Sequence, residues 1–285
     1  LSLQRTRHTE NTIRSFRGDL YLFMAQMGTN LPLSKVTSTQ LQDTLARWQP
    51  ACSFKTLNRR VTTLKGLFGW LWETKILAHN PAGPIVYADV SSPLPQVLTD
   101  AEAARLWEMA RAWAMRDDAP DARPWLLLTL GLHAGLKREE ILTLQVEDVE
   151  IPQEEGTLHL QVRFRGAQLQ REKKKHHERI VGLPTGAKEV LTRYLYLYGD
   201  ACAAGSDTRP PGSLWPWQAR WLTHCLSSLA KEGRIKKGLG LEMLRWTFAL
   251  RLWRSKTPPE VIQAKLGLSA MRFFYVKEML QRLAG

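Results

Sequence analysis

The sequence predicts a mainly α-helical protein with a small β-sheet, built as a helical N-terminal domain followed by a larger α+β domain. Apolar residues recur at spacings of three and four along most of the chain, which is the period of amphipathic helices. One stretch, residues 157–166, alternates apolar and polar residues instead and indicates a strand. The segment SSPLPQ, residues 91–96, combines two prolines with serines and interrupts any helix. We therefore divide the chain into residues 1–90, a linker at 91–98, and residues 99–285.

The charge of the chain narrows its possible partners. Its 285 residues are 44% hydrophobic, enough for a buried core, yet the formal net charge is +13 at pH 7. Such an excess favours a polyanion, nucleic acid first and an acidic membrane second, over a basic protein with no such partner. No apolar run approaches the roughly 18 residues of a membrane span, and the polar start does not resemble a signal peptide. We expect a cytoplasmic, nucleoid-associated protein whose separated cysteines, Cys52, Cys202 and Cys225, are buried free thiols that form neither a zinc site nor a disulfide framework.

The N-terminal domain is predicted to contain three helices, at residues 9–28, 37–48 and 53–77. The third has an apolar stripe of Leu57, Val61, Leu64, Phe68 and Leu71, and its other face carries Lys55, Asn58, Arg59, Arg60 and Lys65. A basic helix face is often only a solvated surface. Residues 1–90 hold 11 Lys and Arg against 5 Asp and Glu, so the nearly uniform sign favours DNA.

The second domain begins with a strong helix start at Thr99, whose capping partner is Glu102 three residues later. An apolar helix, a turn and a second helix start follow within residues 124–144. Further along, the patterns predict strands at 157–166 and 178–184 and helices at 185–199 and 219–233.

Cationic residues gather at two places in this domain. Residues 167–177 form a basic loop between the two strands, which contains Arg171, Lys173, Lys174 and Lys175. A hairpin tip of this kind can enter a DNA groove and present a lysine as a general acid, although a solvated loop has the same composition. Lys137 and Arg138 lie at a helix start after a turn, where they could bind phosphate or form ordinary surface pairs.

Two further stretches near the C-terminus contain residues of possible chemical use. In LEMLRWTFALRLW, residues 241–253, Arg245 stands among apolar neighbours. A buried arginine usually pairs with a carboxylate, and Glu242, three residues earlier, could pair with it for structural reasons alone. The segment AKLGLSAMRFFYVKEML, residues 264–280, contains Tyr275, and an aromatic residue in such a place is normally part of the core.

In this order, and behind a basic helical domain, these features resemble the tyrosine recombinase family of phage integrases and Xer-type recombinases. The resemblance extends over nearly the whole chain. TLNRRVTTLKGLFGWLWETKILAHNPA matches the family's small-domain helix, and LTDAEAARL matches the opening of its catalytic domain. Lys137 in AGLKREEILTLQVEDV stands at the family's first arginine. In KKHHERIVGL, Lys174 stands at the family's hairpin lysine and Arg179 at the arginine that follows. Arg245 in EMLRWTFA stands at the family's second catalytic arginine.

The resemblance implies a helical core-binding domain joined to a catalytic domain that acts on double-stranded DNA. It implies that the Tyr275 hydroxyl forms a 3′-phosphotyrosine and that a DNA 5′-hydroxyl reverses the step, without metal, ATP or other cofactor. Arginines hold the nonbridging phosphate oxygens, and Lys174 protonates the leaving 5′-oxygen. Dimers or tetramers on DNA, or an assembly with another recombinase, follow from the same resemblance. The expected DNA contacts of this domain are Arg138, Arg171, Lys173, Lys175 and Arg179.

The sequence departs from the family's pattern at several of these positions. Lys137 keeps the positive charge but lacks the planar fork that grips two oxygens, and Arg138 could replace it only if the helix were rotated. The first histidine position holds Glu242, the next holds Trp246, and the last holds Leu268, which cannot form a hydrogen bond through its side chain. Tyr275 follows Leu268 after seven residues where about nine are expected.

These departures leave two hypotheses open. One is a divergent active recombinase that uses Tyr275, Arg245, Lys174 and Lys137. The other is a catalytically degenerate accessory or architectural subunit that binds DNA or a partner recombinase without cutting, and the loss of several catalytic groups slightly favours it. An unrelated helical DNA-binding regulator remains a third, weaker alternative.

Overall fold

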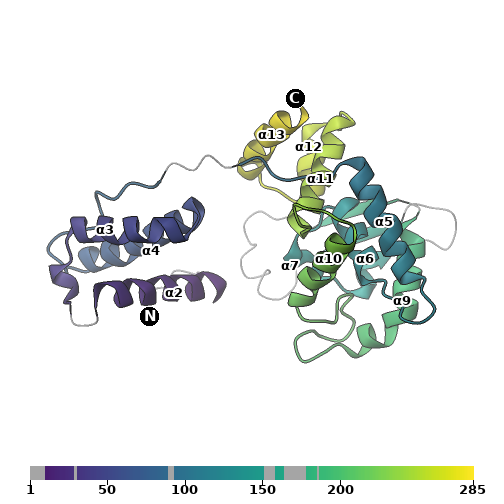
Figure 1. Cartoon of the computed structure of the whole chain (residues 1–285), viewed down its shortest axis with the longest axis horizontal. Coiled ribbons are helices and arrows are strands. Elements are labelled where there is room, and N and C mark those ends of the chain that lie inside the picture. The colour runs from purple at the N-terminus through teal and green to yellow at the C-terminus, as the bar shows by residue number, and fades with distance from the viewer. Residues whose placement is uncertain (1–9, 29–30, 89–92, 151–157, 164–177, 185) are drawn as a thin grey trace. The chain divides into compact units, whose positions relative to one another are not determined.

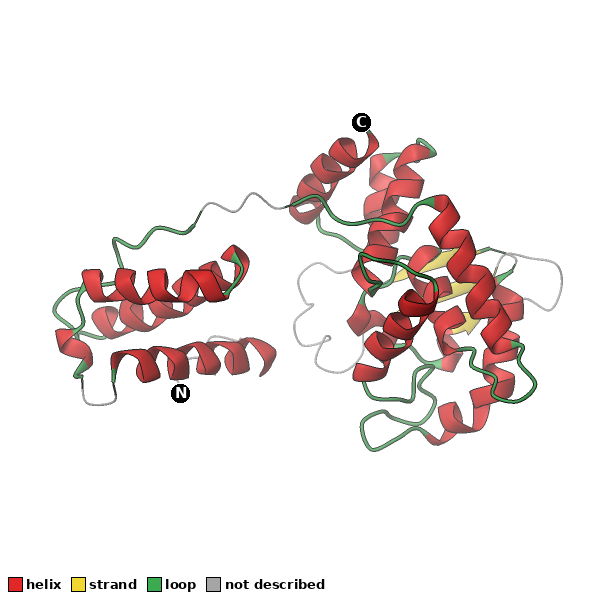
Figure 2. Cartoon of the chain, in the orientation of Figure 1, coloured by secondary structure: helices red, strands yellow, loops and turns green. Residues whose placement is uncertain are grey.

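The structure is a computed structural model that describes residues 10–28, 31–88, 93–150, 158–163, 178–184 and 186–285. The chain falls into two compact units, Leu1–Pro93 and Leu94–Gly285, called unit 1 and unit 2 below (Figure 1). The predicted fold class is confirmed, because helices dominate and the strands form one small sheet (Figure 2).

Unit 1 consists of α2 (Glu10–Met27), α3 (Ser38–Trp48) and α4 (Phe54–Glu73), with short 3₁₀ turns η1 (Leu33–Lys35) and η2 (Gln49–Ala51). Local chemistry sets the ends of these helices. Gly28, at φ +82°, ends α2, since a glycine adopts this left-handed conformation without steric cost. Thr37 and Gln40 cap the start of α3 reciprocally, and the Ser53 hydroxyl accepts from a backbone N–H of α4.

The core of unit 1 lies under the apolar stripe of α4. All five stripe residues predicted above are buried, together with Phe23 of α2, whose ring packs edge-on against Phe68. The helix ends four residues before its predicted end at Leu77. Lys75 takes a left-handed φ of +59°, and the Ile76 and Leu77 N–H groups both donate to the Leu71 carbonyl. The chain thus turns back and buries Leu77 in the same core.

Unit 2 is arranged around one central helix. Its helices are α5 (Asp100–Ala114), α6 (Arg123–Leu132), α7 (Arg138–Thr143), η3 (Val146–Asp148), α9 (Ala187–Ala204), α10 (Arg220–Glu232), α11 (Leu241–Arg254), α12 (Pro259–Leu266) and α13 (Ala270–Ala284). Every residue of α6 after Arg123 is buried, and the helix contacts α5, α9, α10 and α11. A helix without a polar face must be covered by other elements on all sides, and this central position provides that cover.

The sheet contains β1 (Val149–Glu150), β2 (Leu158–Val162) and β3 (Arg179–Leu183), in the order β1-β2-β3 and antiparallel throughout. In β2 the alternating residues Leu158, Leu160 and Val162 are buried, as the period predicted. Residue pairs such as Leu160 and Val181 face each other across β2 and β3. Strand β1 was not predicted, because two residues are too few to show a period. The loop predicted to form the hairpin tip lies outside the described residues.

In unit 2, helices α9 and α12 differ from the sequence prediction. Helix α9 continues past Gly199 to Ala204 and ends at Gly205, which has φ +71° and no room for a side chain. Helix α12 was not predicted, since its eight residues are barely two turns. It begins after Pro258 and ends at Gly267 in the left-handed conformation. Both helix ends therefore coincide with a glycine that the backbone requires.

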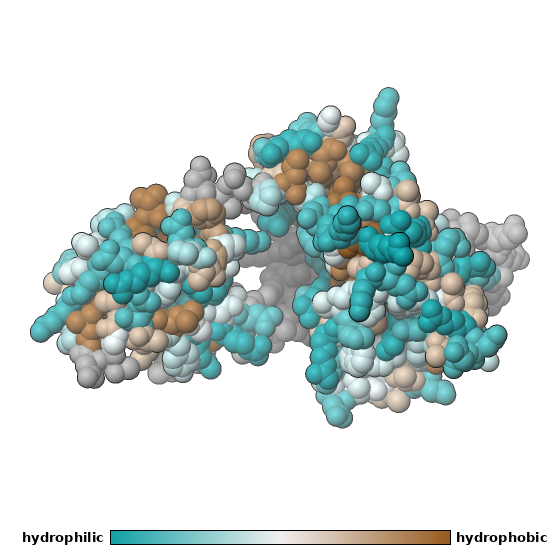
Figure 3. All heavy atoms as spheres, viewed as in Figure 1, coloured by the Kyte–Doolittle hydropathy of each residue, from teal (hydrophilic) through white to brown (hydrophobic). Residues whose placement is uncertain are grey.

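Apolar side chains also reach the surface, and Figure 3 shows them gathered over α12 and α13 at the top of the view. The exposed apolar residues of α13 include Met271 and Phe274, beside the exposed Tyr275. Cys202 and Cys225 are buried free thiols as predicted, whereas the free thiol Cys52 is half-buried. Within the described residues, no helix combines the length and apolar character of a membrane span.

Candidate functional site

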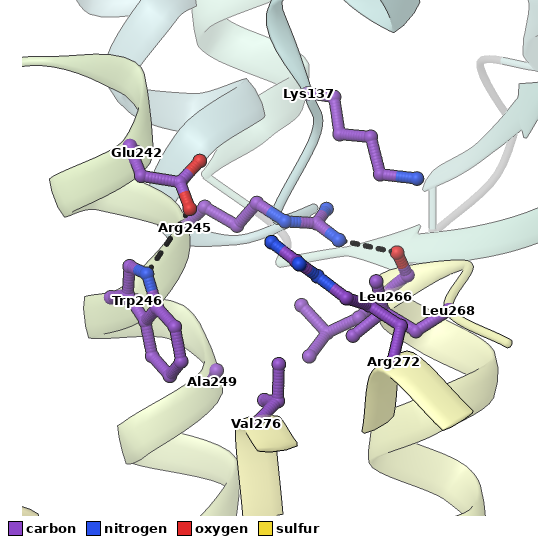
Figure 4. A pocket seen from close by; sticks show the side chains of 9 residues that line it. All are labelled: Lys137, Glu242, Arg245, Trp246, Ala249, Leu266, Leu268, Arg272 and Val276. Atoms are coloured by element: carbon purple, nitrogen blue, oxygen red, sulfur yellow. Dashed lines mark hydrogen bonds between the residues drawn. The ribbon is translucent and has the colours of Figure 1, made fainter. Parts of the chain in front are cut away.

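A pocket of about 200 Å³ in unit 2 brings together five of the seven predicted catalytic or substituted catalytic positions (Figure 4). They come from the start of α7, from α11, from the end of α12 and from α13. The lining residues are Lys137, Glu242, Arg245, Trp246, Ala249, Leu266, Leu268, Arg272 and Val276. Five of these were singled out from the sequence as catalytic or substituted catalytic positions, although they are spread over more than a hundred residues of the chain.

Arg245 is the most buried cation of this pocket. Only 7% of the residue is exposed, and its guanidinium donates to the backbone carbonyls of Gly135 and Leu266. Burial lowers the pKa of Arg245 to about 10, so the side chain stays positively charged at neutral pH. A guanidinium has five N–H donors, so these two bonds fix its orientation without using all of them.

Three consecutive carbonyls at the end of α12 each accept a hydrogen bond from a cation of another element. The bonds run from Arg179 Nε to Lys265 O (2.9 Å), from Arg245 Nη2 to Leu266 O, and from Lys137 Nζ to Gly267 O (3.1 Å). The last carbonyls of a helix have no partner within it and form the negative end of its dipole. The C-terminus of α12 therefore gathers the cations and sets their positions.

Arg179 was predicted to contact DNA, and the structure gives it a different role. Its side chain is only 8% exposed, and both terminal nitrogens donate to the Glu140 carboxylate at 2.9 Å. Glu140 also accepts from the Lys137 backbone N–H at 2.8 Å. Burial would raise the pKa of Glu140, but the bonds and charge of Arg179, with a smaller contribution from Lys137, lower it below its usual value. Arg179 is thus a structural residue, occupied inside unit 2.

Glu242 and Trp246 form a pair of their own within the pocket. The Trp246 indole N–H donates to Glu242 Oε1 at 3.1 Å, one helical turn away on α11. In the described part of the chain, no ion pair within 4 Å joins Glu242 to Arg245, whose guanidinium is bonded to the Gly135 and Leu266 carbonyls instead. Leu268 presents an apolar side chain to the same pocket.

Tyr275 lies on α13 but does not line the pocket. The residue is 58% exposed, and its ring packs edge-on against that of Phe274 with the ring centroids 5.8 Å apart. Arg272 and Val276, on the same helix, do line the pocket. On a helix, neighbours in sequence point about 100° apart, so Tyr275 occupies the surface beside the pocket.

Arg272 is the charged lining residue that the sequence analysis did not single out. It lies in the first turn of α13, where its backbone N–H donates to the Ser269 hydroxyl at 3.4 Å. No family motif marks this position. The available signal was its spacing, because a residue three positions before Tyr275 lies next to it on a helix.

Most of the predicted DNA-contacting residues of unit 1 are engaged within that unit. The Asn58 side chain both donates to and accepts from the backbone of Ala88, each at 2.8 Å. Arg59 pairs with Asp19 at 2.6 Å, and the Arg60 guanidinium lies 5.0 Å from the centroid of the Trp48 ring. Lys65 donates to the Gly83 carbonyl at 3.3 Å. Lys55 is exposed on α4, as is Arg138 on α7 in unit 2. Arg171, Lys173, Lys174 and Lys175 lie outside the described residues.

Comparisons with known proteins agree with this architecture. Residues 96–273 match the phage integrase family. A tyrosine recombinase of Thermosipho africanus is 21% identical over 271 residues, covering 92% of this chain and 86% of its own. The tyrosine recombinase XerD of Listeria innocua is 25% identical over 277 residues, covering 90% and 84%.

Solved structures show the same fold at low sequence identity. XerH site-specific recombinase, in a post-cleavage complex with palindromic difH substrate, superposes with a TM-score of 0.74 at 16% identity, covering 95% of this chain and 76% of that one. A lambda integrase dimer bound to a COC′ core site gives a TM-score of 0.66 at 14% identity, covering 100% and 92%. These likenesses establish the fold.

Proposed function

The chain belongs to the phage integrase family of tyrosine recombinases, and from that premise we propose that it binds double-stranded DNA and acts in site-specific DNA recombination. The pocket around Arg245 receives the DNA phosphodiester. Unit 1 acts as the core-binding domain and unit 2 as the catalytic-type domain, with the linker near residues 91–98 between them. No metal and no cofactor enters this proposal.

The charge of the pocket is the observation that carries the proposal. Three lining residues are cations, namely Lys137, Arg245 and Arg272, and only Glu242 is a carboxylate. The lining therefore has an excess of two positive charges around a small space, which attracts an anion. Its other residues are apolar apart from the Trp246 indole, and they suit the sugar that flanks a phosphate in DNA.

Strand cleavage in this site would follow the chemistry of the family. The Tyr275 oxygen attacks phosphorus, the P–O5′ bond breaks, and a 3′-phosphotyrosine forms as the tyrosine loses its proton. Lys174 gives a proton to the 5′-oxygen that leaves. The cations of the pocket stabilise the charge that builds on the nonbridging oxygens, and this contribution is worth roughly 10²- to 10³-fold for each well-placed donor.

A second candidate function is an accessory subunit that binds DNA without cutting it. Tyr275 lies outside the pocket lining, and Leu268 brings no hydrogen-bonding group to it. These two observations support the second candidate, whereas the cationic lining is consistent with both. Because related structures are described as complexes with DNA, and one as a dimer on DNA, either candidate would work as a dimer or tetramer on DNA, or together with another recombinase.

A covalent trapping experiment separates the two candidates. The chain is incubated with a duplex that it binds in a gel-shift assay, carrying a nick next to the cleaved position so that the released fragment diffuses away. An active recombinase accumulates a covalent adduct that Tyr275→Phe abolishes. Tyr196→Phe is the matched control, since Tyr196 is 78% exposed on α9 and should leave the adduct unchanged. Binding without an adduct would refute cleavage and leave the accessory role.

A further inference from the structure

Arg272 is a cation of the pocket for which neither the family pattern nor the strand-cleavage chemistry above provides a role. It extends from α13 into the pocket with its guanidinium directed toward Arg245 (Figure 4). Among the described residues, no carboxylate lies within ion-pair distance of its guanidinium, although Glu242 lines the same pocket. Arg245, in turn, is bonded to carbonyls and not to a carboxylate.

Arg245 and Arg272 line one pocket and repel each other, and Glu242, the one carboxylate of the lining, offsets only part of the positive charge. Burial is the main cause that lowers the pKa of Arg245; the charges of Glu140 and Glu242 raise it, and those of Arg179 and, least of all, Arg272 lower it further. Because the cations of the lining outnumber its carboxylate, an anion placed between the two guanidinium groups relieves their repulsion. A phosphodiester suits the position, because it offers two nonbridging oxygens to donors that approach from different sides.

The two arginines approach from different elements and are held differently. Arg245 comes from α11 and is fixed by the carbonyls of Gly135 and Leu266. Arg272 is exposed and comes from the first turn of α13. Lys137, at the position where the family has its first arginine, is bonded to the Gly267 carbonyl and cannot offer a planar fork. The pocket thus contains two guanidinium forks in spite of the lysine.

We propose that Arg272 is a phosphate-binding residue, which together with Arg245 holds one DNA phosphodiester and replaces the arginine fork that is missing at Lys137. This inference rests on the proposed function for the identity of the ligand. It assigns the second fork to α13, the helix that also carries Tyr275. Engagement of the phosphate by Arg272 would therefore bring the helix of the tyrosine to the substrate.

The inference can be tested on the full chain with inorganic phosphate as the probe. Phosphate binding to the folded state raises the thermal unfolding midpoint, which is compared with chloride at equal ionic strength. The wild type should bind phosphate, and Arg272→Gln should weaken its affinity roughly 10- to 100-fold, the range for a lost charge-assisted hydrogen bond. Arg272→Lys should restore part of it. Arg282→Gln is the matched control, because it removes the same charge from an exposed position on the same helix.

Every outcome of this experiment either supports or contradicts the role of Arg272 in phosphate binding. Since Arg272 is exposed, its substitution should leave the midpoint in chloride unchanged, so a lost phosphate response is not a folding defect. If Arg272→Gln responds to phosphate like Arg282→Gln, or if the wild type shows no response, the inference is overturned. The covalent adduct with nicked DNA tests the proposed function separately. An adduct that forms equally with Arg272→Gln, together with unchanged phosphate affinity, would remove the inference and leave the proposed function standing.

Discussion

The substitution Gly267→Ala probes the turn on which the cations of the site converge. Gly267 has φ +56°, a left-handed conformation that costs a residue with a Cβ atom about 1–2 kcal/mol. A Cβ atom added there would lie 2.5 Å from Arg179 Nη1 and 3.0 Å from Arg179 Cζ. Arg179 cannot move away cheaply, because it is bonded to the Lys265 carbonyl and to both oxygens of Glu140.

The expected destabilisation has two parts. The backbone conformation contributes about 1–2 kcal/mol, and displacement of Arg179 removes both of its bonds to the buried Glu140 carboxylate, which costs about 3–5 kcal/mol. Gly238→Ala is the matched control, because Gly238 has φ +76° and nothing lies within 4 Å of an added Cβ atom. Only the backbone part applies to Gly238, so Gly267→Ala should be the more destabilising change by about 3 kcal/mol.

Urea unfolding followed by circular dichroism measures both free energies, with the slopes compared to show that the same cooperative transition is observed. A double-mutant cycle with Arg179→Met then isolates the clash. In the Arg179→Met background the guanidinium is gone, and Gly267→Ala should cost only what Gly238→Ala costs. If Gly267→Ala costs the same in both backgrounds, Arg179 does not hold this turn and the reasoning fails.

Three further changes test other parts of the structure. His133 is half-buried beside Trp107, and its partial burial, with a smaller effect from the charge of Arg251, lowers its pKa to about 4. Below pH 6.5 the unfolded state then binds more protons than the folded state. The free energy of unfolding of the wild type should therefore fall by up to about 3 kcal/mol between pH 6.5 and pH 4 relative to that of His133→Phe. Unfolding midpoints measured across that window test this. Gly131→Ala should cost about 1–3 kcal/mol in urea unfolding, since its Cβ atom would lie 2.6 Å from Leu244 Cβ, whereas Gly199→Ala in the open middle of α9 should not destabilise. Lys55→Gln should weaken DNA binding and lower the slope of log affinity against log salt by about 0.9, and an unchanged slope would place α4 away from DNA.

Helix starts and ends were predictable where a few neighbouring residues determine them. The capping box of Thr99 and Glu102 is present, with the Thr99 N–H donating to the Glu102 carboxylate at 2.8 Å. The glycine at 28 ends its helix because only a glycine takes that φ freely. Alternating burial in β2 followed from its period of two. All of these features depend on contacts within about four residues, which a sequence displays directly.

The roles of the arginines were not predictable in the same way, because distant parts of the chain decide them. Arg179 resembles a DNA contact in its motif, but its partner Glu140 lies 39 residues earlier in the chain. Arg59 is likewise occupied by Asp19, so reversing its charge would disturb unit 1 before it tested DNA binding. Arg272 carries no motif, and its place in the pocket depends on how α13 packs against α11. The role of a basic residue therefore becomes clear only when the structure shows which carboxylates lie beside its side chain.

The substituted positions of the pocket can be understood together as a balance of charge. Glu242 brings a negative charge to a place where the family has a histidine, and alone it would oppose the binding of a phosphate. The indole of Trp246 donates to this carboxylate and thereby orients it along α11. Arg272 adds one positive charge to the same lining, which offsets the charge of Glu242 and keeps the excess positive. The pocket can therefore depart from the family at three histidine positions and keep an excess of positive charge, so the phosphate binding proposed above does not require those histidines.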